Sequence, residues 1–263
     1  MINKVPVRIE PLNRLAFLDI YLPDDYYCTD ERYPVLYMFD GQNLFYDDQA
    51  AFGTSWGLRD YLDATRRKII VVGIECDHQG ENRLHEYTPY ALKSTNFGET
   101  SGKGAILMEW IVQALKPKID STFRTWPQRE ATAIAGSSMG GLMAFYAVIH
   151  HNEIFSKAAC LSPSIMLCEE EISREFEHKD LFEDTRIYWS FGSKELSPKN
   201  RMEAQMLLDE YRDSLRIRGG LGRIVIVEDG EHNEECWRAQ NEEVFRFLWD
   251  DPKDFVDAQP ASA

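Results

Sequence analysis

The sequence is short of positive charge and of long hydrophobic runs. It has 29 Lys and Arg residues against 44 Asp and Glu residues, which gives a formal net charge of −15. Nucleic-acid binding needs basic side chains that neutralise phosphates, so this balance argues against a nucleic-acid partner and disfavours a strongly anionic substrate. The apolar runs are far shorter than the roughly 20 residues that span a bilayer, so no membrane association is expected.

Several other signals are missing. The first eight residues, Met1-Ile-Asn-Lys-Val-Pro-Val-Arg8, lack the apolar stretch of a secretory signal, so a cytoplasmic protein is expected. The five cysteines are an odd number without CxxC spacing, which indicates free thiols in a reducing compartment. No Cys, His and carboxylate set has zinc spacing, and no calcium-binding loop is present. No metal or other cofactor is therefore expected.

The apolar content, 44% of 263 residues, is enough for the core of one large domain. Short β-branched or aromatic runs predict eight strands, and helical periodicity predicts five helices. The strands are expected at 5–10, 15–22, 34–39, 69–74, 131–135, 157–161, 186–191 and 223–228. The helices are expected at 56–64, 105–116, 142–150, 199–216 and 234–249.

This alternation predicts an α/β fold, with a mostly parallel eight-stranded sheet and helices on both faces. The first two strands have no helix between them, so an antiparallel hairpin at one edge is expected. Residues 1–250 are expected to form a single α/β domain and residues 251–263 a frayed tail. The connection at 162–185 is too short for a large lid, which predicts an open or lightly covered site.

The most informative motif is Gly136-Ser137-Ser138-Met139-Gly140, which reads Gly-x-Ser-x-Gly between a predicted strand and a predicted helix. In a nucleophile elbow this sharp turn exposes a serine hydroxyl, and the glycines let the helix start close to the strand. The frame singles out Ser138 as the nucleophile, because Ser137 would need glycines at positions 135 and 139.

A serine nucleophile of this fold needs an acid and then a histidine later in the chain. His232 follows the eighth predicted strand, where the hydrolase base lies. Glu195 follows the seventh strand and is the expected acid, which would orient the imidazole and stabilise its charged form. Asp229 is the alternative acid, because it is close to His232 in sequence.

An acyl-transfer site also needs donors for the oxyanion and a substrate pocket. The N–H of Met139, at a helix start, and the N–H of Gln42, after the third strand, are the expected oxyanion donors. Arg83 and Tyr87 follow the fourth strand, where such folds present loops to ligands, and Trp56 follows the oxyanion loop; these three are candidate substrate-binding residues. A structural Arg83–Glu86 pair and a packing role for Trp56 are the alternatives.

Six segments together resemble the putative esterase family of α/β-hydrolases, which includes siderophore esterases, feruloyl esterases, S-formylglutathione hydrolases and the antigen 85 mycolyltransferases. They occur in family order at 33–43 (Tyr-Pro-Val-Leu-Tyr-Met-Phe-Asp-Gly-Gln-Asn), 83–89, 135–141, 161–164 (Leu-Ser-Pro-Ser), 192–195 (Gly-Ser-Lys-Glu) and 230–237 (Gly-Glu-His-Asn-Glu-Glu-Cys-Trp). The resemblance implies Ser138 as nucleophile, His232 as base, Glu195 as acid, and an oxyanion hole at Gln42 and Met139.

The sequence therefore predicts a serine carboxylic-ester hydrolase that acts through an acyl-enzyme. Siderophore esterases bind a large trianionic iron complex with basic residues, whereas this chain is acidic, so a small acyl or aryl ester is the expected substrate. Two alternatives remain: an acyltransferase that uses the same triad, and a binding protein on a catalytically silent hydrolase fold. The sequence makes no prediction of oligomeric state.

Overall fold

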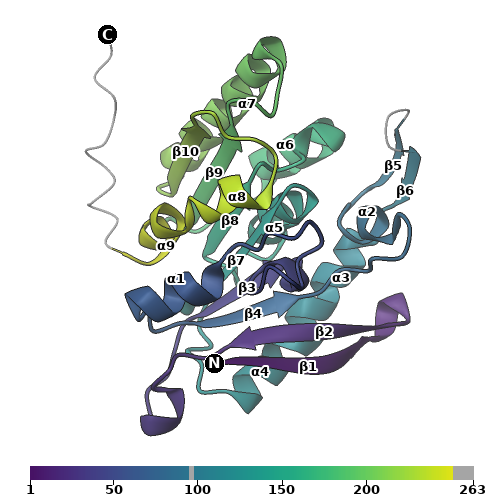
Figure 1. The fold of residues 1–263 in the computed structure, drawn as a ribbon. Helices are drawn as coiled ribbons and strands as arrows, with labels where there is room; N and C mark the ends of the chain where they lie inside the picture. The colour runs from purple at the N-terminus through teal and green to yellow at the C-terminus, as the bar shows by residue number, and fades with distance from the viewer. Residues whose placement is uncertain (95–97, 251–263) are drawn as a thin grey trace.

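The centre of the molecule is a twisted eight-stranded sheet, seen in a computed structural model that describes residues 1–94 and 98–250 (Figure 1). Its strands, in spatial order, are β1 (Ile2–Ile9), β2 (Arg14–Tyr21), β4 (Ile70–Ile74), β3 (Val35–Phe39), β7 (Thr132–Ser137), β8 (Lys157–Leu161), β9 (Arg186–Gly192) and β10 (Leu221–Val227). β1 and β2 form an antiparallel hairpin, β2 is antiparallel to β4, and every other pairing in this sheet is parallel. The predicted α/β fold and its edge hairpin are confirmed.

Helices cover both faces of the sheet (Figure 1). Alternation along β3 explains why, since Leu36 and Met38 join the core on one face while Tyr37 and Phe39 join the core on the other. The first face is covered by α1 (Leu58–Thr65), α8 (Glu234–Arg238) and α9 (Asn241–Trp249). The second face is covered by α3 (Gly104–Trp110), α4 (Lys116–Thr122), α5 (Met139–His150), α6 (Glu169–His178) and α7 (Pro198–Ile217).

Two predicted helices are interrupted. The helix expected at 105–116 is divided into α3, a π-helical turn at Ile111–Leu115, and α4. Pro117 accounts for this turn, because it has no N–H and its ring would clash with the carbonyl one α-helical turn earlier. The helix expected at 234–249 is divided into α8 and α9.

Some elements were not predicted from the sequence. These are α6, the short α2 (Asn82–Glu86), and a hairpin of β5 (Ala91–Ser94) with β6 (Gly98–Ser101). The acidic start of α6 resembles a solvated loop, yet Ile172 and Phe176 bury one face of it. No helix among the described residues has the length and apolar character needed to cross a bilayer. The extent of the domain stays a prediction, and the predicted tail at 251–263 lies outside the described residues.

Helix α5 is anchored by aromatic packing. Phe145 is fully buried and contacts the rings of Phe176, Trp189 and Tyr211, which come from α6, β9 and α7. This cluster joins the helix that carries Ser138 at its start to the half of the sheet that carries Glu195.

We predict that Phe145→Ala lowers the free energy of unfolding by about 3–5 kcal/mol, because it leaves a cavity at this junction. Urea denaturation of wild type and variant measures the change. Phe182→Ala is the control, since Phe182 is 54% exposed, and it should cost about 1 kcal/mol or less. A Phe145→Ala variant as stable as this control would contradict the assignment.

Candidate active site

Ser138 occupies a strained turn between β7 and α5. Its backbone angles are φ 56° and ψ −121°, a conformation that L-residues rarely adopt. A Cβ at Gly136 would lie 2.6 Å from the carbonyl carbon of Gly140, and one at Gly141 would lie 2.9 Å from the carbonyl oxygen of Leu161. The glycines therefore permit a close approach of helix and strand that any side chain would prevent.

The loop between β10 and α8 brings His232 against Glu195. Nδ1 of His232 lies 2.9 Å from Oε2 of Glu195, whose side chain is only 4% exposed. The other carboxylate oxygen, Oε1, accepts hydrogen bonds from the N–H of Gly192 at 2.6 Å and from Oγ of Ser162 at 2.7 Å. The Ser162 hydroxyl in turn accepts a hydrogen bond from Nε1 of Trp237 at 2.9 Å. Both oxygens of the buried carboxylate are thus held in place.

Asp229, the alternative acid, does not contact His232 in this arrangement. Its Oδ1 lies 2.8 Å from Nζ of Lys194, and its side chain is 75% exposed. The residue has a φ of 57°, so the chain turns sharply between β10 and the histidine. Of the two candidates, Glu195 is the one that the structure brings to the imidazole.

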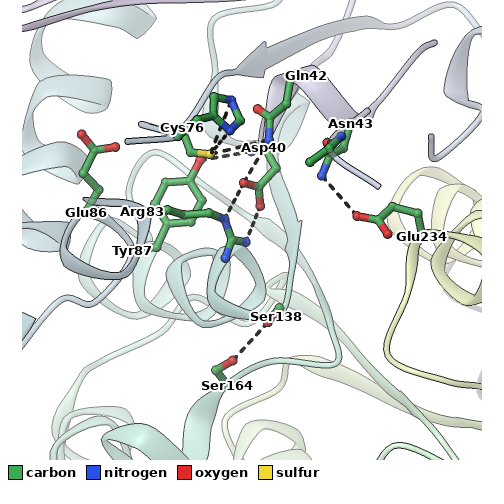
Figure 2. Close-up of polar contacts among 12 residues, drawn as sticks. Asp40, Gln42, Asn43, Cys76, Arg83, Glu86, Tyr87, Ser138, Ser164 and Glu234 are labelled. Atoms are coloured by element: carbon green, nitrogen blue, oxygen red, sulfur yellow. Dashed lines mark hydrogen bonds and ion pairs between the residues drawn. The ribbon is translucent and has the colours of Figure 1, made fainter. Parts of the chain in front are cut away.

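The Ser138 hydroxyl faces open space beside the histidine. Its Oγ lies 3.4 Å from Oγ of Ser164, as Figure 2 shows. No hydrogen bond joins Ser138 to His232 in the described part of the chain, but both residues line the same two cavities. Catalytic hydrogen bonds are often long or unformed before substrate binds, so the missing bond is compatible with a serine–histidine pair.

The two expected oxyanion donors lie on adjacent loops. Met139 is the first residue of α5, so its N–H points out of the helix start, where the helix dipole favours negative charge. Gln42 lies in the 3₁₀ turn η3 (Gly41–Asn43), directly after β3. Within residues 1–94 and 98–250, neither N–H donates to a backbone acceptor. A Cβ at Gly41 would lie 2.7 Å from the carbonyl carbon of Gly73, so this turn packs tightly on β4.

Arg83 binds the loop that carries Gln42. Its Nε and Nη2 donate to the two oxygens of Asp40 at 2.7 and 2.6 Å, as the dashed lines in Figure 2 show. Burial is the largest single influence and acts to lower the pKa of Arg83, but the charge and the hydrogen bonds of Asp40, with smaller contributions from Tyr87 and Cys76, together raise it. The Arg83–Glu86 pair considered from the sequence does not form, because Glu86 instead accepts two hydrogen bonds from Arg14, at 2.5 and 2.8 Å.

The three candidate substrate-binding residues differ in depth. Arg83 lines both cavities beside Ser138. Tyr87 is fully buried, and its hydroxyl accepts a hydrogen bond from the N–H of Asp40 at 3.1 Å. Trp56 is 3% exposed and packs against Trp237, with 6.1 Å between ring centroids. Tyr87 and Trp56 therefore lie behind the loops that form the site.

The sequence reasoning missed several residues that shape the site. Ser162 and Ser164 belong to the Leu161–Ser164 motif, which signalled a family but gave no role to either hydroxyl. Glu234 is buried two residues after the histidine, where its Oε1 accepts a hydrogen bond from Asn43 at 3.2 Å (Figure 2). Among the described residues, no group of three or more His, Cys, Asp or Glu side chains is arranged to hold a metal ion.

Comparison with known proteins gives a family match. The profile described as "Putative esterase" matches residues 10–248. The Bacillus subtilis (strain 168) protein YbbA, itself described as uncharacterized, is 26% identical over 205 residues, which are 76% of this chain and 78% of YbbA. Esterase Rv1288 of Mycobacterium tuberculosis is 28% identical over 150 residues; these are 56% of this chain but only 29% of Rv1288.

Solved structures share the fold at low identity. An IroE-like serine hydrolase from Shewanella oneidensis has a TM-score of 0.74 at 20% identity, over 93% of this chain and 79% of that one. The BES protein from Bacillus cereus has a TM-score of 0.75 at 18% identity, over 94% and 95% of the two chains. The enterobactin esterase FES from Shigella flexneri has a TM-score of 0.69 at 20% identity, over 95% of this chain and 59% of FES.

We predict that Ser162→Ala lowers kcat/KM for a simple ester by roughly tenfold, because Glu195 loses a charge-assisted hydrogen bond that fixes its carboxylate. Steady-state hydrolysis of 4-nitrophenyl acetate measures the loss. Ser214→Ala, in the last turn of helix α7, is the control and should leave the rate unchanged. Equal rates for the two variants would remove Ser162 from this role.

Proposed function

Because this chain belongs to the putative esterase family of α/β-hydrolases and is an esterase, we propose that it hydrolyses small acyl or aryl esters through an acyl-enzyme on Ser138. The supporting observation is the 2.9 Å hydrogen bond between His232 and a buried Glu195, beside a serine held in a nucleophile elbow. Such a pair is suited to accept the serine proton, because the carboxylate stabilises the imidazolium that forms.

The first half of the reaction forms the acyl-enzyme. Ser138 Oγ rotates away from Ser164, gives its proton to Nε2 of His232 and attacks the ester carbonyl carbon. The carbonyl oxygen becomes an oxyanion, which the N–H groups of Gln42 and Met139 stabilise. When the tetrahedral intermediate collapses, the bond to the alcohol oxygen breaks and His232 returns its proton to the departing alkoxide. The products are a free alcohol and an ester of Ser138.

The second half releases the acid. A water molecule takes the place of the alcohol, gives a proton to His232 and attacks the acyl carbon through the same oxyanion site. Collapse breaks the bond to Ser138 Oγ, which regains its proton from the histidine. Glu195 stays ionised throughout and holds the imidazole by its Nδ1–H.

We predict that Ser138→Ala and His232→Ala each lower kcat for 4-nitrophenyl acetate by a factor on the order of 10³ or more, because neither variant can form the acyl-enzyme efficiently. Steady-state kinetics and labelling by a fluorophosphonate measure the two effects. A wild-type protein that is folded, cleaves no 4-nitrophenyl ester from acetate to octanoate and resists labelling would support the silent binding fold instead. Preferential ester formation with an added alcohol would support an acyltransferase.

The acid can be assigned with matched amide variants. Glu195→Gln should lower kcat by a factor on the order of 10² or more, because a neutral amide cannot stabilise the imidazolium. Asp229→Asn removes the same charge from an exposed residue and should change kcat less than about twofold. The reverse order of the two losses, measured on 4-nitrophenyl acetate, would assign the acid to Asp229.

A further inference from the structure

Ser138 lies where two cavities of different chemistry meet. Each has a volume of about 560 Å³, within the range that holds small organic ligands. Ser138, His232 and Arg83 line both cavities. An ester at the serine would therefore extend into both, with its acyl part in one and its alcohol part in the other.

The first cavity is apolar. Among the residues that the structure describes, Arg83, Glu195 and His232 are the charged or titratable side chains that line it. Its wall comes from the 3₁₀ turn η6 (Ile165–Leu167), from β9 and from α7, and includes Ile165, Leu167, Phe191, Leu207 and Leu208. A hydrocarbon chain would gain the free energy of leaving water there, whereas a polar group would lose hydrogen bonds with water.

The second cavity is polar and acidic. Asp40, Asp77 and Glu234 line it, together with Arg83 and the imidazoles of His78 and His232. Arg83 is already bound to both oxygens of Asp40, and among the described residues neither Asp77 nor Glu234 forms an ion pair. Asp77 instead accepts hydrogen bonds from the N–H of Gln79 and from Nδ2 of Asn82, at 2.9 Å each.

Glu234 is the carboxylate that can accept a further hydrogen bond from a ligand. One oxygen accepts the hydrogen bond from Asn43, and no Lys, Arg or His side chain in the described part of the chain forms an ion pair with it. Burial and the nearby charge of Asp40 raise the pKa of Glu234, and the attraction of Arg83 and His232 does not offset them. A ligand that donates a hydrogen bond would satisfy this group, whereas a ligand anion would be repelled by it.

The order of the reaction steps indicates which cavity holds the acyl part of the ester and which holds the alcohol part. The acyl group stays bound to Ser138 while water replaces the alcohol, so the cavity that the alcohol leaves has to admit water next to His232. The polar cavity meets this requirement. The apolar cavity can stay filled by the acyl chain during both halves of the reaction.

We propose, resting on the esterase function above, that the substrate joins a hydrocarbon acyl chain to a hydrogen-bond-donating alcohol without negative charge, and that Glu234 selects this alcohol. A neutral polyol or an amino alcohol fits the acidic cavity. A phosphate-bearing or carboxylate-bearing alcohol does not, because its charge would face Glu234 and Asp77.

The alcohol side is tested with three octanoyl esters: 1-octanoylglycerol, 2-(dimethylamino)ethyl octanoate, whose protonated tertiary amine donates an N–H, and 1-octanoylglycerol 3-phosphate. Wild type should show a kcat/KM about tenfold or more higher for the first two than for the phosphate ester. Glu234→Gln should reduce the ratio of kcat/KM for the amino ester to that for the phosphate ester by about fivefold or more. Glu235→Gln makes the same charge change one residue away on an exposed position and should change this ratio less than about twofold. A wild-type preference for the phosphate ester, or equal ratios in the two variants, would overturn the proposal.

The acyl side is tested with 4-nitrophenyl acetate and octanoate. Burial of part of the longer chain should raise kcat/KM by about tenfold or more in wild type. Leu207→Trp fills the apolar cavity and should lower the octanoate-to-acetate ratio by about tenfold. Met206→Trp is the control, because Met206 is 57% exposed on the same helix. A ratio that is unchanged in Leu207→Trp would contradict the assignment.

These outcomes are distinct from failure of the esterase function. Suppose that wild type cleaves acetate esters and is labelled by a fluorophosphonate, but prefers neither the esters without negative charge over the phosphate ester nor octanoate over acetate. That result would refute the cavity assignment alone. Wild type that neither cleaves acetate esters nor is labelled by a fluorophosphonate would refute the serine-esterase mechanism itself. Variants that fail to fold are recognised by lost labelling and by circular dichroism, and the wild-type substrate ratios still decide the proposal in that case.

Discussion

The close approach of β7 and α5 is the constraint on which the site depends. It requires glycine at position 136, where a Cβ would overlap the backbone of Gly140 in α5, while glycine at position 141 lets α5 lie close to the backbone of Leu161 at the end of β8. The same approach forces Ser138 to a positive φ and leaves its hydroxyl above the edge of the sheet. The packing of α5 compensates for the unfavourable backbone conformation of Ser138, since every residue of α5 from Met139 to Ile149 is buried. The fold thus stabilises a local conformation that the serine would not adopt in a free chain.

The position of the acid in the proposed triad depends on residues from three separate parts of the chain that meet at one edge of the sheet. Ser162 follows β8, Glu195 follows β9 and Trp237 lies in α8, and these three residues form one hydrogen-bonded chain that ends at His232. Parallel strands that lie side by side bring their carboxyl ends to one edge, so loops far apart in sequence meet there. The arrangement gives a buried carboxylate fixed partners without adding a second charge beside it.

Much of the fold could be predicted from the sequence because its strands are short apolar runs separated by polar turns. All eight strands of the main sheet were predicted, as was the edge hairpin, whereas α6 was missed because three glutamates at its start resemble a solvated loop. The break at Pro117 shows where local backbone chemistry overrides helical periodicity.

The site was predictable only in part. The motif placed Ser138, but sequence proximity could not decide between Glu195 and Asp229, since a single turn at Asp229 directs that side chain toward Lys194. The sequence also does not show how deeply each side chain is buried, so Tyr87 and Trp56 could not be distinguished from residues that line the cavities. The sequence shows that residue 234 is a glutamate, but its role at the site can be inferred only from the structure, where it is buried and forms no ion pair among the described residues.

The central claim is that an acyl group is carried on Ser138 during turnover. Mass spectrometry of the protein, quenched in acid while it hydrolyses 4-nitrophenyl acetate and then digested with trypsin, tests this most directly. Ser138 lies in the tryptic peptide that runs from Glu130 to Lys157. We predict that this peptide gains the mass of one acetyl group, that fragmentation places the group on Ser138, and that Ser138→Ala abolishes it. Turnover with the acetyl group on another residue, or turnover by wild type with no acetylated peptide, would contradict the account.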